Sequence, residues 1–126
     1  MLKIEAKYIH YMFTRCHMKL AIIGSRSIVV KNLETYLPQG VSEIVSGGAR
    51  GVDTVAADYA KRMGITLTEF LPEYARYKRA APLMRNKQIA EYADEVLAFW
   101  DGSSKGTMHT VELFRKLGKK VTVIQK

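Results

Sequence analysis

From residue 18 onward, short apolar runs alternate along the chain with amphipathic stretches, and this alternation limits the folds that the chain can adopt. Five strand-like runs are found, at 19–23, 43–46, 65–71, 95–100 and 120–124. Four helical patterns separate them, at 28–36, 52–63, 83–93 and 107–117. Strands that alternate with helices pair in parallel, and the helices cover both faces of their sheet. The sequence therefore predicts an α/β fold, an open parallel five-stranded sheet with helices on both faces.

The length of 126 residues fits one domain, because a chain of this size can bury a core large enough for stability. We assign residues 18–126 to this domain and residues 1–17 to an amino-terminal extension, since 1–17 shows no clear apolar period. Two interpretations of the extension stay open. Either the natural protein starts at residue 18, or the aromatic side chains of 1–17 pack as an additional strand or helix.

The chain carries 20 lysine and arginine residues against 12 aspartate and glutamate residues, a formal net charge of +8. Such a surplus attracts anions, including nucleotides and nucleic acid, although it also serves solubility alone. The composition, 48% hydrophobic and 25% charged, is that of a globular protein. The single cysteine, Cys16, and the lack of a secretory signal or a membrane-length apolar stretch predict a cytoplasmic protein without a membrane partner.

Metal binding is not expected from the histidines of this chain. They are His10, His17 and His109, and none stands beside a second ligand at the spacing that metal sites use. The sequence identifies no certain cofactor.

The segments that follow the strands hold the candidate ligand residues, because open parallel sheets bind ligands beyond the carboxyl ends of their strands. The first segment follows the run at 19–23. Gly24 lets the chain turn close to a ligand, Ser25 can donate its hydroxyl or cap a helix, and Arg26 can pair with an anion. A plain turn between a strand and a helix is the other interpretation of these three residues.

The second segment, residues 46–53, has three glycines within five residues between an apolar strand and an amphipathic helix. Such a loop can point backbone amides at a phosphate, and the positive end of the helix dipole adds to the attraction. The loop is neither a Walker loop nor a GxGxxG fingerprint. Asp53 is expected to cap the helix, to contact a ribose hydroxyl, or to do both. The candidate ligand residues here are Ser46, Gly47, Gly48, Arg50, Gly51 and Asp53.

The third segment is a predicted basic loop at 73–82, where tyrosines lie between basic residues in a pattern suited to phosphate pairing and base stacking. A solvated basic surface explains Arg76, Lys78 and Arg79 equally well. Arg85 and Asn86 are predicted to open the next helix at the ligand edge of the sheet. These two residues are the ligand candidates from this part of the chain.

The fourth segment follows the run at 95–100 and consists of small residues that lead into a helix. Thr107 is the predicted N-cap of this helix. Trp100 either stacks on a base or belongs to the core, and His109 is expected to be an exposed helix residue. The candidate ligand residues are Asp101, Gly102, Ser103, Gly106 and Thr107, and Ser104 can help to close the same phosphate pocket.

These four segments, in this order, resemble the SLOG superfamily, which includes the DNA-processing A proteins and the LONELY GUY phosphoribohydrolases. Residues 21–26 and 45–53 are similar to the first two motifs of the DNA-processing proteins. The later motifs are more similar to the small single-domain YspA-type branch, and they are Arg85-Asn86, 98–102 and Gly106-Thr107. The resemblance covers nearly the whole chain after residue 17. It implies a Rossmann-like fold and a nucleotide-derived ligand.

The LONELY GUY enzymes cleave an N-glycosidic bond with an arginine and with a glutamate that follows a Gly-Thr pair. The resemblance places Arg85 at the arginine and Thr110 at the glutamate. Glu112 lies two residues further on, displaced by about 200° around a helix. We therefore expect a protein that binds or senses a nucleotide or nucleotide derivative. A phosphoribohydrolase that uses Arg85 and Glu112 on a nucleoside monophosphate is the alternative.

Binding of single-stranded DNA is a further alternative. It is suggested by the resemblance to the DNA-processing proteins and by the charge of +8, since neutralised phosphates dominate such binding. Analogy with the family also suggests a homodimer.

Overall fold

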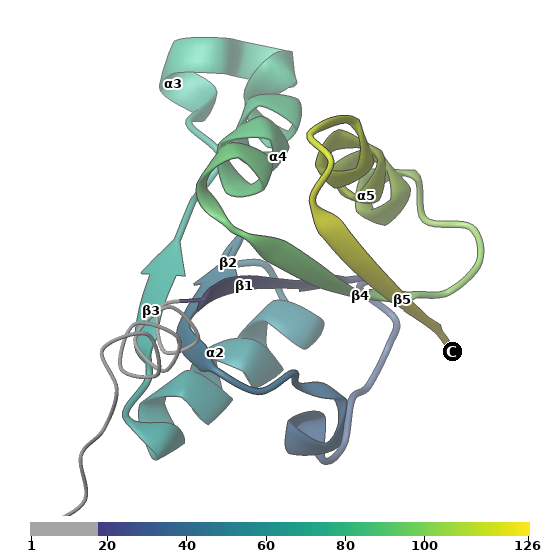
Figure 1. Cartoon of the computed structure of the whole chain (residues 1–126). Coiled ribbons are helices and arrows are strands. Elements are labelled where there is room, and N and C mark those ends of the chain that lie inside the picture. Colours follow the sequence, from purple (N-terminus) through teal and green to yellow (C-terminus); the bar gives the residue numbers. More distant parts are fainter. Residues whose placement is uncertain (1–17) are drawn as a thin grey trace, which may run out of the picture.

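A five-stranded parallel sheet forms the centre of residues 18–126, the part of the chain that the computed structural model describes (Figure 1). In chain order the elements are β1 (Met18–Gly24), η1 (Leu33–Tyr36), β2 (Val41–Ser46), α2 (Val52–Met63), β3 (Thr66–Glu69), α3 (Tyr74–Tyr77), η2 (Lys78–Ala80), α4 (Ala81–Tyr92), β4 (Glu95–Trp100), α5 (Lys105–Lys116) and β5 (Lys120–Gln125). The expected extension at 1–17, with Cys16 and two of the histidines, lies outside the described residues.

The strands lie in the order β3-β2-β1-β4-β5, and every neighbouring pair is parallel. The chain builds outward from β1 to β3 on one side and then crosses over to place β4 and β5 on the other side. The strand order therefore reverses between β1 and β4, whose carboxyl ends meet where Gly24 pairs with Phe99. The predicted fold class, a five-stranded parallel sheet with helices on both faces, is confirmed.

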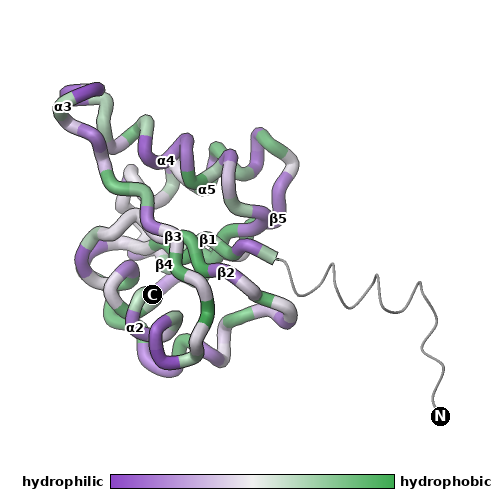
Figure 2. Tube along the Cα trace, turned by 90° about the vertical axis from the view of Figure 1, so that its left-hand side faces the viewer, coloured by the Kyte–Doolittle hydropathy of each residue, from purple (hydrophilic) through white to green (hydrophobic). Residues whose placement is uncertain are grey.

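Alternate side chains of the central strands enter two separate cores. On β1, Leu20 and Ile22 face the core under α2, whereas Ala21 and Ile23 face the core under α4 and α5. Figure 1 shows α2 on one face of the sheet and α4 with α5 on the other. In Figure 2 the central strands are largely coloured hydrophobic, because they are buried on both faces.

The predicted helix at 28–36 is wrong. Only Leu33–Tyr36 is helical, as the short 3-10 helix η1. Ile28 and Val30 are buried while Val29 between them is 75% exposed, so burial has the period of two that an extended chain produces. Three successive β-branched residues favour this extended form. Asn32 then reverses the chain with φ of 55°.

The predicted loop at 73–82 is also wrong, because this stretch forms α3, η2 and the start of α4. The sequence pattern places Pro82 in this loop, but the residue lies in the first turn of α4, where proline fits because no amide donor is needed there. Arg85 and Asn86 consequently lie in the second turn of α4 and do not open the helix.

Helices α2 and α5 lie at or close to the residues that the sequence predicts for them. α2 spans the predicted residues and ends at Gly64, which adopts the left-handed conformation expected of a C-terminal glycine. Met63, the last residue of α2, is 58% exposed. α5 begins at Lys105, two residues earlier than predicted, because Ser104 and not Thr107 is its N-cap. In the described part of the chain, no helix is long and apolar enough to cross a membrane.

Lys119 joins the end of α4 to the loop before β5. Its ammonium group donates to the carbonyl oxygens of Ala90 (2.7 Å), Glu91 (3.0 Å) and Ala93 (2.7 Å). These carbonyls belong to the last turn of α4 and its C-cap, where the helix dipole is negative. The lysine therefore stabilises α4 through both hydrogen bonds and charge.

Replacing Lys119 with methionine keeps an apolar stem of similar length and removes the charged donor. We expect the free energy of unfolding to fall by about 1–3 kcal/mol, because hydrogen bonds to a charged donor contribute about that much. Urea denaturation of both proteins measures the change. The matched control is Lys116→Met at an exposed position of α5, which should cost less than about 0.5 kcal/mol. Equal losses in the two variants would contradict the capping role.

Candidate functional site

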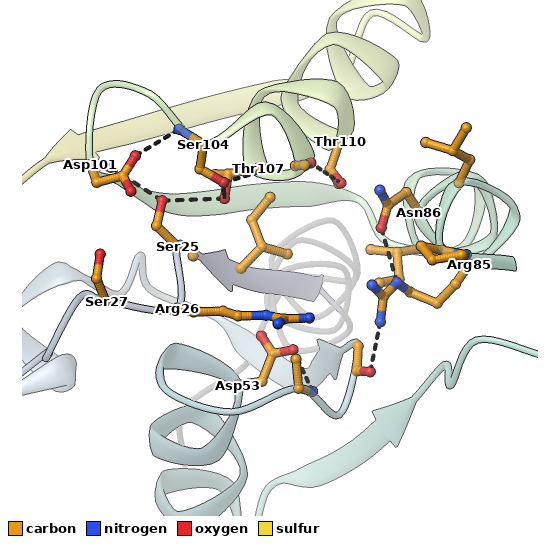
Figure 3. Close-up of a pocket in the computed structure, with 18 residues that line it drawn as sticks. Ser25, Arg26, Ser27, Asp53, Arg85, Asn86, Asp101, Ser104, Thr107 and Thr110 are labelled. Carbon is orange, nitrogen blue, oxygen red and sulfur yellow. Dashed lines mark hydrogen bonds between the residues drawn. The ribbon is translucent and has the colours of Figure 1, made fainter. Parts of the chain in front are cut away.

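A cleft of about 530 Å³ lies beyond the carboxyl ends of β1 and β4, at the reversal of the strand order (Figure 3). This is the place where open parallel sheets bind ligands. Four parts of the chain line it: the end of β1, the loop between β2 and α2, the first turns of α4, and the segment from Asp101 into α5. Each of the four segments that the sequence singled out contributes to the cleft.

The predicted ligand residues divide into two groups. Those that line the cleft are Gly24, Ser25, Arg26, Gly47, Asp53, Arg85, Asn86, Asp101, Gly106 and Thr107. Those that do not line it are Ser46, Gly48, Arg50, Gly51, Gly102 and Ser103. The sequence analysis missed several lining residues, namely Ser27, Pro82, Leu83 and Thr110. It also missed that Ser104 caps α5, although its spacing, three residues before Thr107, was a usable signal, because an N-cap side chain accepts from the amide at N3.

Gly24 allows the end of β1 to approach α2 closely. A Cβ atom at this position would lie 2.8 Å from Cβ of Val52 and 3.0 Å from the carbonyl oxygen of Phe99. Its place in the sheet therefore depends on the absence of a side chain. The next residue, Ser25, is 2% exposed, and its amide donates to the same Phe99 oxygen (3.0 Å).

The glycine loop between β2 and α2 is braced by its own side chains. The hydroxyl of Ser46 accepts the amide of Gly48 (3.1 Å), and Oδ2 of Asp53 accepts the amide of Ala49 (2.8 Å). Two of the amides expected to hold a phosphate are thus already bonded within the loop. The expectation that Asp53 caps α2 is wrong, because the N-cap is Gly51 and Asp53 reaches back to the loop.

Asp53 is a buried carboxyl group on the wall of the cleft, with 8% of the residue exposed. Burial raises the pKa of this carboxyl, while the amide of Ala49 and the charge of Arg85 lower it, and burial outweighs them. A carboxyl group with a raised pKa in a cleft is a frequent feature of functional sites.

The pKa of Asp101 is shifted in the opposite direction to that of Asp53. Its Oδ1 accepts the amides of Ser103 (2.9 Å) and Ser104 (2.7 Å), and these hydrogen bonds lower the pKa of the carboxyl. The side chain thereby fixes the turn before α5. The indole N–H of Trp100 donates to the carbonyl oxygen of Ser104 (3.1 Å) and braces the same turn. Trp100 is half-buried and does not line the cleft.

Hydroxyl groups line the cleft at the start of α5. Oγ of Ser25 accepts the amide of Asp101 (3.2 Å) and lies 3.5 Å from Oγ1 of Thr107. Oγ1 of Thr107 in turn lies 3.2 Å from Oγ of Ser104, the N-cap. The hydroxyls therefore connect the end of β1 to the first turn of α5.

Arg85 is held in place by two hydrogen bonds. Nη1 donates to the carbonyl oxygen of Gly47 (2.8 Å), and Nε donates to Oδ1 of Asn86 (2.9 Å). A Cβ atom at Gly47 would lie 2.6 Å from Nη1, so this glycine makes room for the guanidinium. Arg26 reaches the cleft from the other side, and Figure 3 shows both guanidinium groups directed toward its middle.

Several candidates lie outside the cleft. Glu112 is exposed on α5 and pairs with Arg115 (2.5 Å), so it cannot act as an acid in the cleft, and Thr110 lines the cleft instead. Arg76 and the other basic residues of α3 and η2 are exposed and do not line it either. His109, expected to be exposed, is half-buried and contacts Asn86.

Within residues 18–126, no group of three or more histidine, cysteine, aspartate and glutamate side chains is arranged to hold a metal ion. Neither the sequence, compared with protein-family models and curated proteins, nor the structure, compared with solved structures, gives a match. The resemblance to the SLOG superfamily stays a prediction.

The raised pKa of Asp53 predicts how stability depends on pH. In the unfolded chain this carboxyl titrates near its ordinary pKa of 3.8, and in the folded protein the pKa is higher. Between the two values the folded state binds more protons than the unfolded state, so the free energy of unfolding falls as the pH rises. Asp53→Asn cannot ionise and should lack this fall. The variant should match or exceed the wild-type stability at neutral pH and lose that advantage below the unfolded pKa.

Denaturant unfolding of both proteins on either side of this pH window measures the difference. Asp58→Asn, at an exposed position of the same helix, is the matched control and should follow the wild type. A variant that is less stable than the wild type at neutral pH, with the control unchanged, would contradict the prediction.

Proposed function

We propose that the cleft binds a nucleotide or nucleotide derivative, with its phosphate at the start of α5. The observation that carries this proposal is that two guanidinium groups and the hydroxyl-lined first turn of a helix border one cleft at the strand-order reversal. Arg26 and Arg85 supply positive charge and N–H donors that suit a phosphate. The first turn of α5 adds the positive end of a helix dipole.

The start of α5 suits a phosphate better than the glycine loop does. In the loop, the amides of Gly48 and Ala49 are already accepted by side chains, and the Asp53 carboxyl repels an anion whenever it is ionised. At α5, Gly106 lines the cleft without a side chain. The amide of Thr107 is accepted by Ser104 (3.5 Å), and the helix amides before it have no partner within the helix. The sequence-based prediction is therefore refined, and the glycine loop serves to place Arg85 and Asp53.

The remaining lining residues fit the other parts of a nucleotide. Asp53 can accept a hydrogen bond from a sugar hydroxyl, as the sequence analysis considered. Pro82 and Leu83, the latter 51% exposed, form an apolar stretch of the wall that can cover a base. A volume of about 530 Å³ lies in the range of small-molecule sites.

Membership of the SLOG superfamily is part of this proposal. Its support is that residues from all of the matching motifs border the same cleft. The phosphoribohydrolase alternative loses its acid, because Glu112 lies outside the cleft. Single-stranded DNA is the second candidate ligand, and exposed Arg76, Lys78 and Arg79 on α3 and η2 favour it.

Calorimetric titration with AMP, ribose 5-phosphate and adenosine tests the proposal. We expect AMP to bind more tightly than ribose 5-phosphate, and adenosine to bind most weakly, because the phosphate supplies the charged contacts. Arg26→Ala should weaken AMP binding by about tenfold, the effect of one lost charge-assisted hydrogen bond. Arg79→Ala removes the same charge outside the cleft and should leave AMP affinity unchanged. Equal losses of AMP affinity in both variants, or adenosine binding as tight as AMP binding, would refute the proposed function.

The same titrations separate the other candidates. Adenine released from AMP and detected by chromatography would support the phosphoribohydrolase alternative. Binding of oligo-dT that is tighter than AMP binding, falls steeply with salt and is weakened by Arg79→Ala would favour the DNA alternative.

Gly106 offers an independent test because one substitution should move stability and affinity in opposite directions. A Cβ atom at this position meets nothing within 4 Å, and alanine suits a helix better than glycine by up to about 1 kcal/mol. Gly106→Ala should therefore raise the melting temperature of the free protein. Its methyl group stands over the start of α5 and should weaken AMP binding. A variant that binds AMP as tightly as the wild type would place the phosphate elsewhere.

A further inference from the structure

Asn86 connects Arg85 to a histidine on the neighbouring helix. Asn86 is 8% exposed, and both ends of its amide are engaged. Oδ1 accepts Nε–H of Arg85 (2.9 Å), and Nδ2 lies 3.3 Å from Nδ1 of His109. Figure 3 shows the first of these contacts beside the cleft. The guanidinium in the cleft is thus linked through one amide group to a titratable ring on α5.

The hydrogen-bond donors and acceptors of Arg85, Asn86 and His109 determine the protonation state and the tautomer of the histidine. Nε of Arg85 can only donate, so the amide oxygen of Asn86 must face it. The amide nitrogen, which also only donates, then faces His109 and needs an acceptor there. Nδ1 accepts a hydrogen bond only in the neutral imidazole whose proton is on Nε2. The observed arrangement therefore requires neutral His109.

We propose that His109 is a positioning residue for Arg85, and that protonation of His109 releases this arginine. A protonated ring places N–H at Nδ1 opposite the N–H of Asn86. The amide must then turn over to offer its oxygen to His109, which brings its nitrogen against Nε of Arg85. The first arrangement sets two donors against each other, and the second removes the acceptor from Nε of Arg85. Arg85 then keeps only its hydrogen bond to Gly47. The effect on ligand affinity rests on the proposed function.

Charged groups on α4 and on α5 itself can act on His109, and α4 carries Arg85, Lys87 and Glu91. The elements packed against α5 are α4, β4 and β5. The strands contribute apolar side chains to the core beneath α5, namely Val96, Ala98, Val121 and Val123. From α4, Arg85 acts on the ring through Asn86. On α5 itself, Lys105 and Glu112 lie one turn before and one turn after His109, with opposite charges.

Whether protonation of His109 weakens or strengthens anion binding distinguishes this mechanism from general electrostatics. Protonation adds positive charge to the protein, which by itself strengthens the binding of an anion. Release of Arg85 has the opposite consequence. Weaker anion binding on protonation of His109 therefore requires a structural link such as Asn86.

The first arm of the experiment needs no ligand. The 15N-labelled protein gives a resonance for Nε–H of Arg85, assigned by its loss in Arg85→Lys. We expect this resonance to be shifted and protected from exchange at about pH 8 and to lose both properties as the pH is lowered to about 5.5. In His109→Leu the resonance should lack the shift and the protection at both pH values. In His109→Gln it should keep them at both, because the glutamine amide oxygen accepts a hydrogen bond at every pH. Glu112→Gln, an exposed change on the same helix, should behave as the wild type.

The second arm measures the dissociation constant of AMP at the same two pH values. The wild-type dissociation constant is divided by that of His109→Gln at each pH. This ratio removes the effect of AMP's own phosphate titration, because that titration changes both constants equally. We expect this ratio to rise by about tenfold from pH 8 to pH 5.5, as for the loss of one hydrogen bond to a charged group. An Arg85 resonance unaffected by pH and by His109→Leu would overturn the positioning role. Failure of the wild type to bind AMP, with the resonance behaving as expected, would refute the proposed function alone.

Discussion

The pairing of β1 with β2 on one side and with β4 on the other decides where the cleft lies. The chain leaves β1 toward the face that α2 covers, and it leaves β4 toward the face that α5 covers (Figure 1). The segments that follow these two neighbouring strands therefore diverge, and a space opens between them. The hydroxyls of Ser25 and Thr107 come from the two diverging segments and still approach to 3.5 Å at the base of that space.

Apolar periodicity was sufficient to predict the sheet, because each buried strand is a short apolar run that ends at a turn residue. Helix α2 was predicted best, since its bounds and the left-handed Gly64 follow from local signals. The errors fall where local signals were ambiguous. Residues 28–36 contain apolar residues that suit either period, and Pro82 suits either a loop or the first turn of a helix.

For the site, the sequence could predict which segments meet but not how their side chains bond. Parallel strands bring their carboxyl ends to one edge, so the four segments had to be neighbours. The contact of Arg85 with Gly47 spans 38 residues, and that of Ser25 with Thr107 spans 82. No local rule gives such pairings. The use of loop amides by Asp53 was equally invisible, because capping of its own helix was the simpler interpretation.

The position of Trp100 has a practical consequence. It is the only tryptophan of the chain, and its indole N–H donates to Ser104, the residue that caps α5. The environment of the indole therefore changes whenever the turn between β4 and α5 moves. Intrinsic fluorescence of the unlabelled protein consequently reports on one wall of the cleft, without a probe that would disturb it.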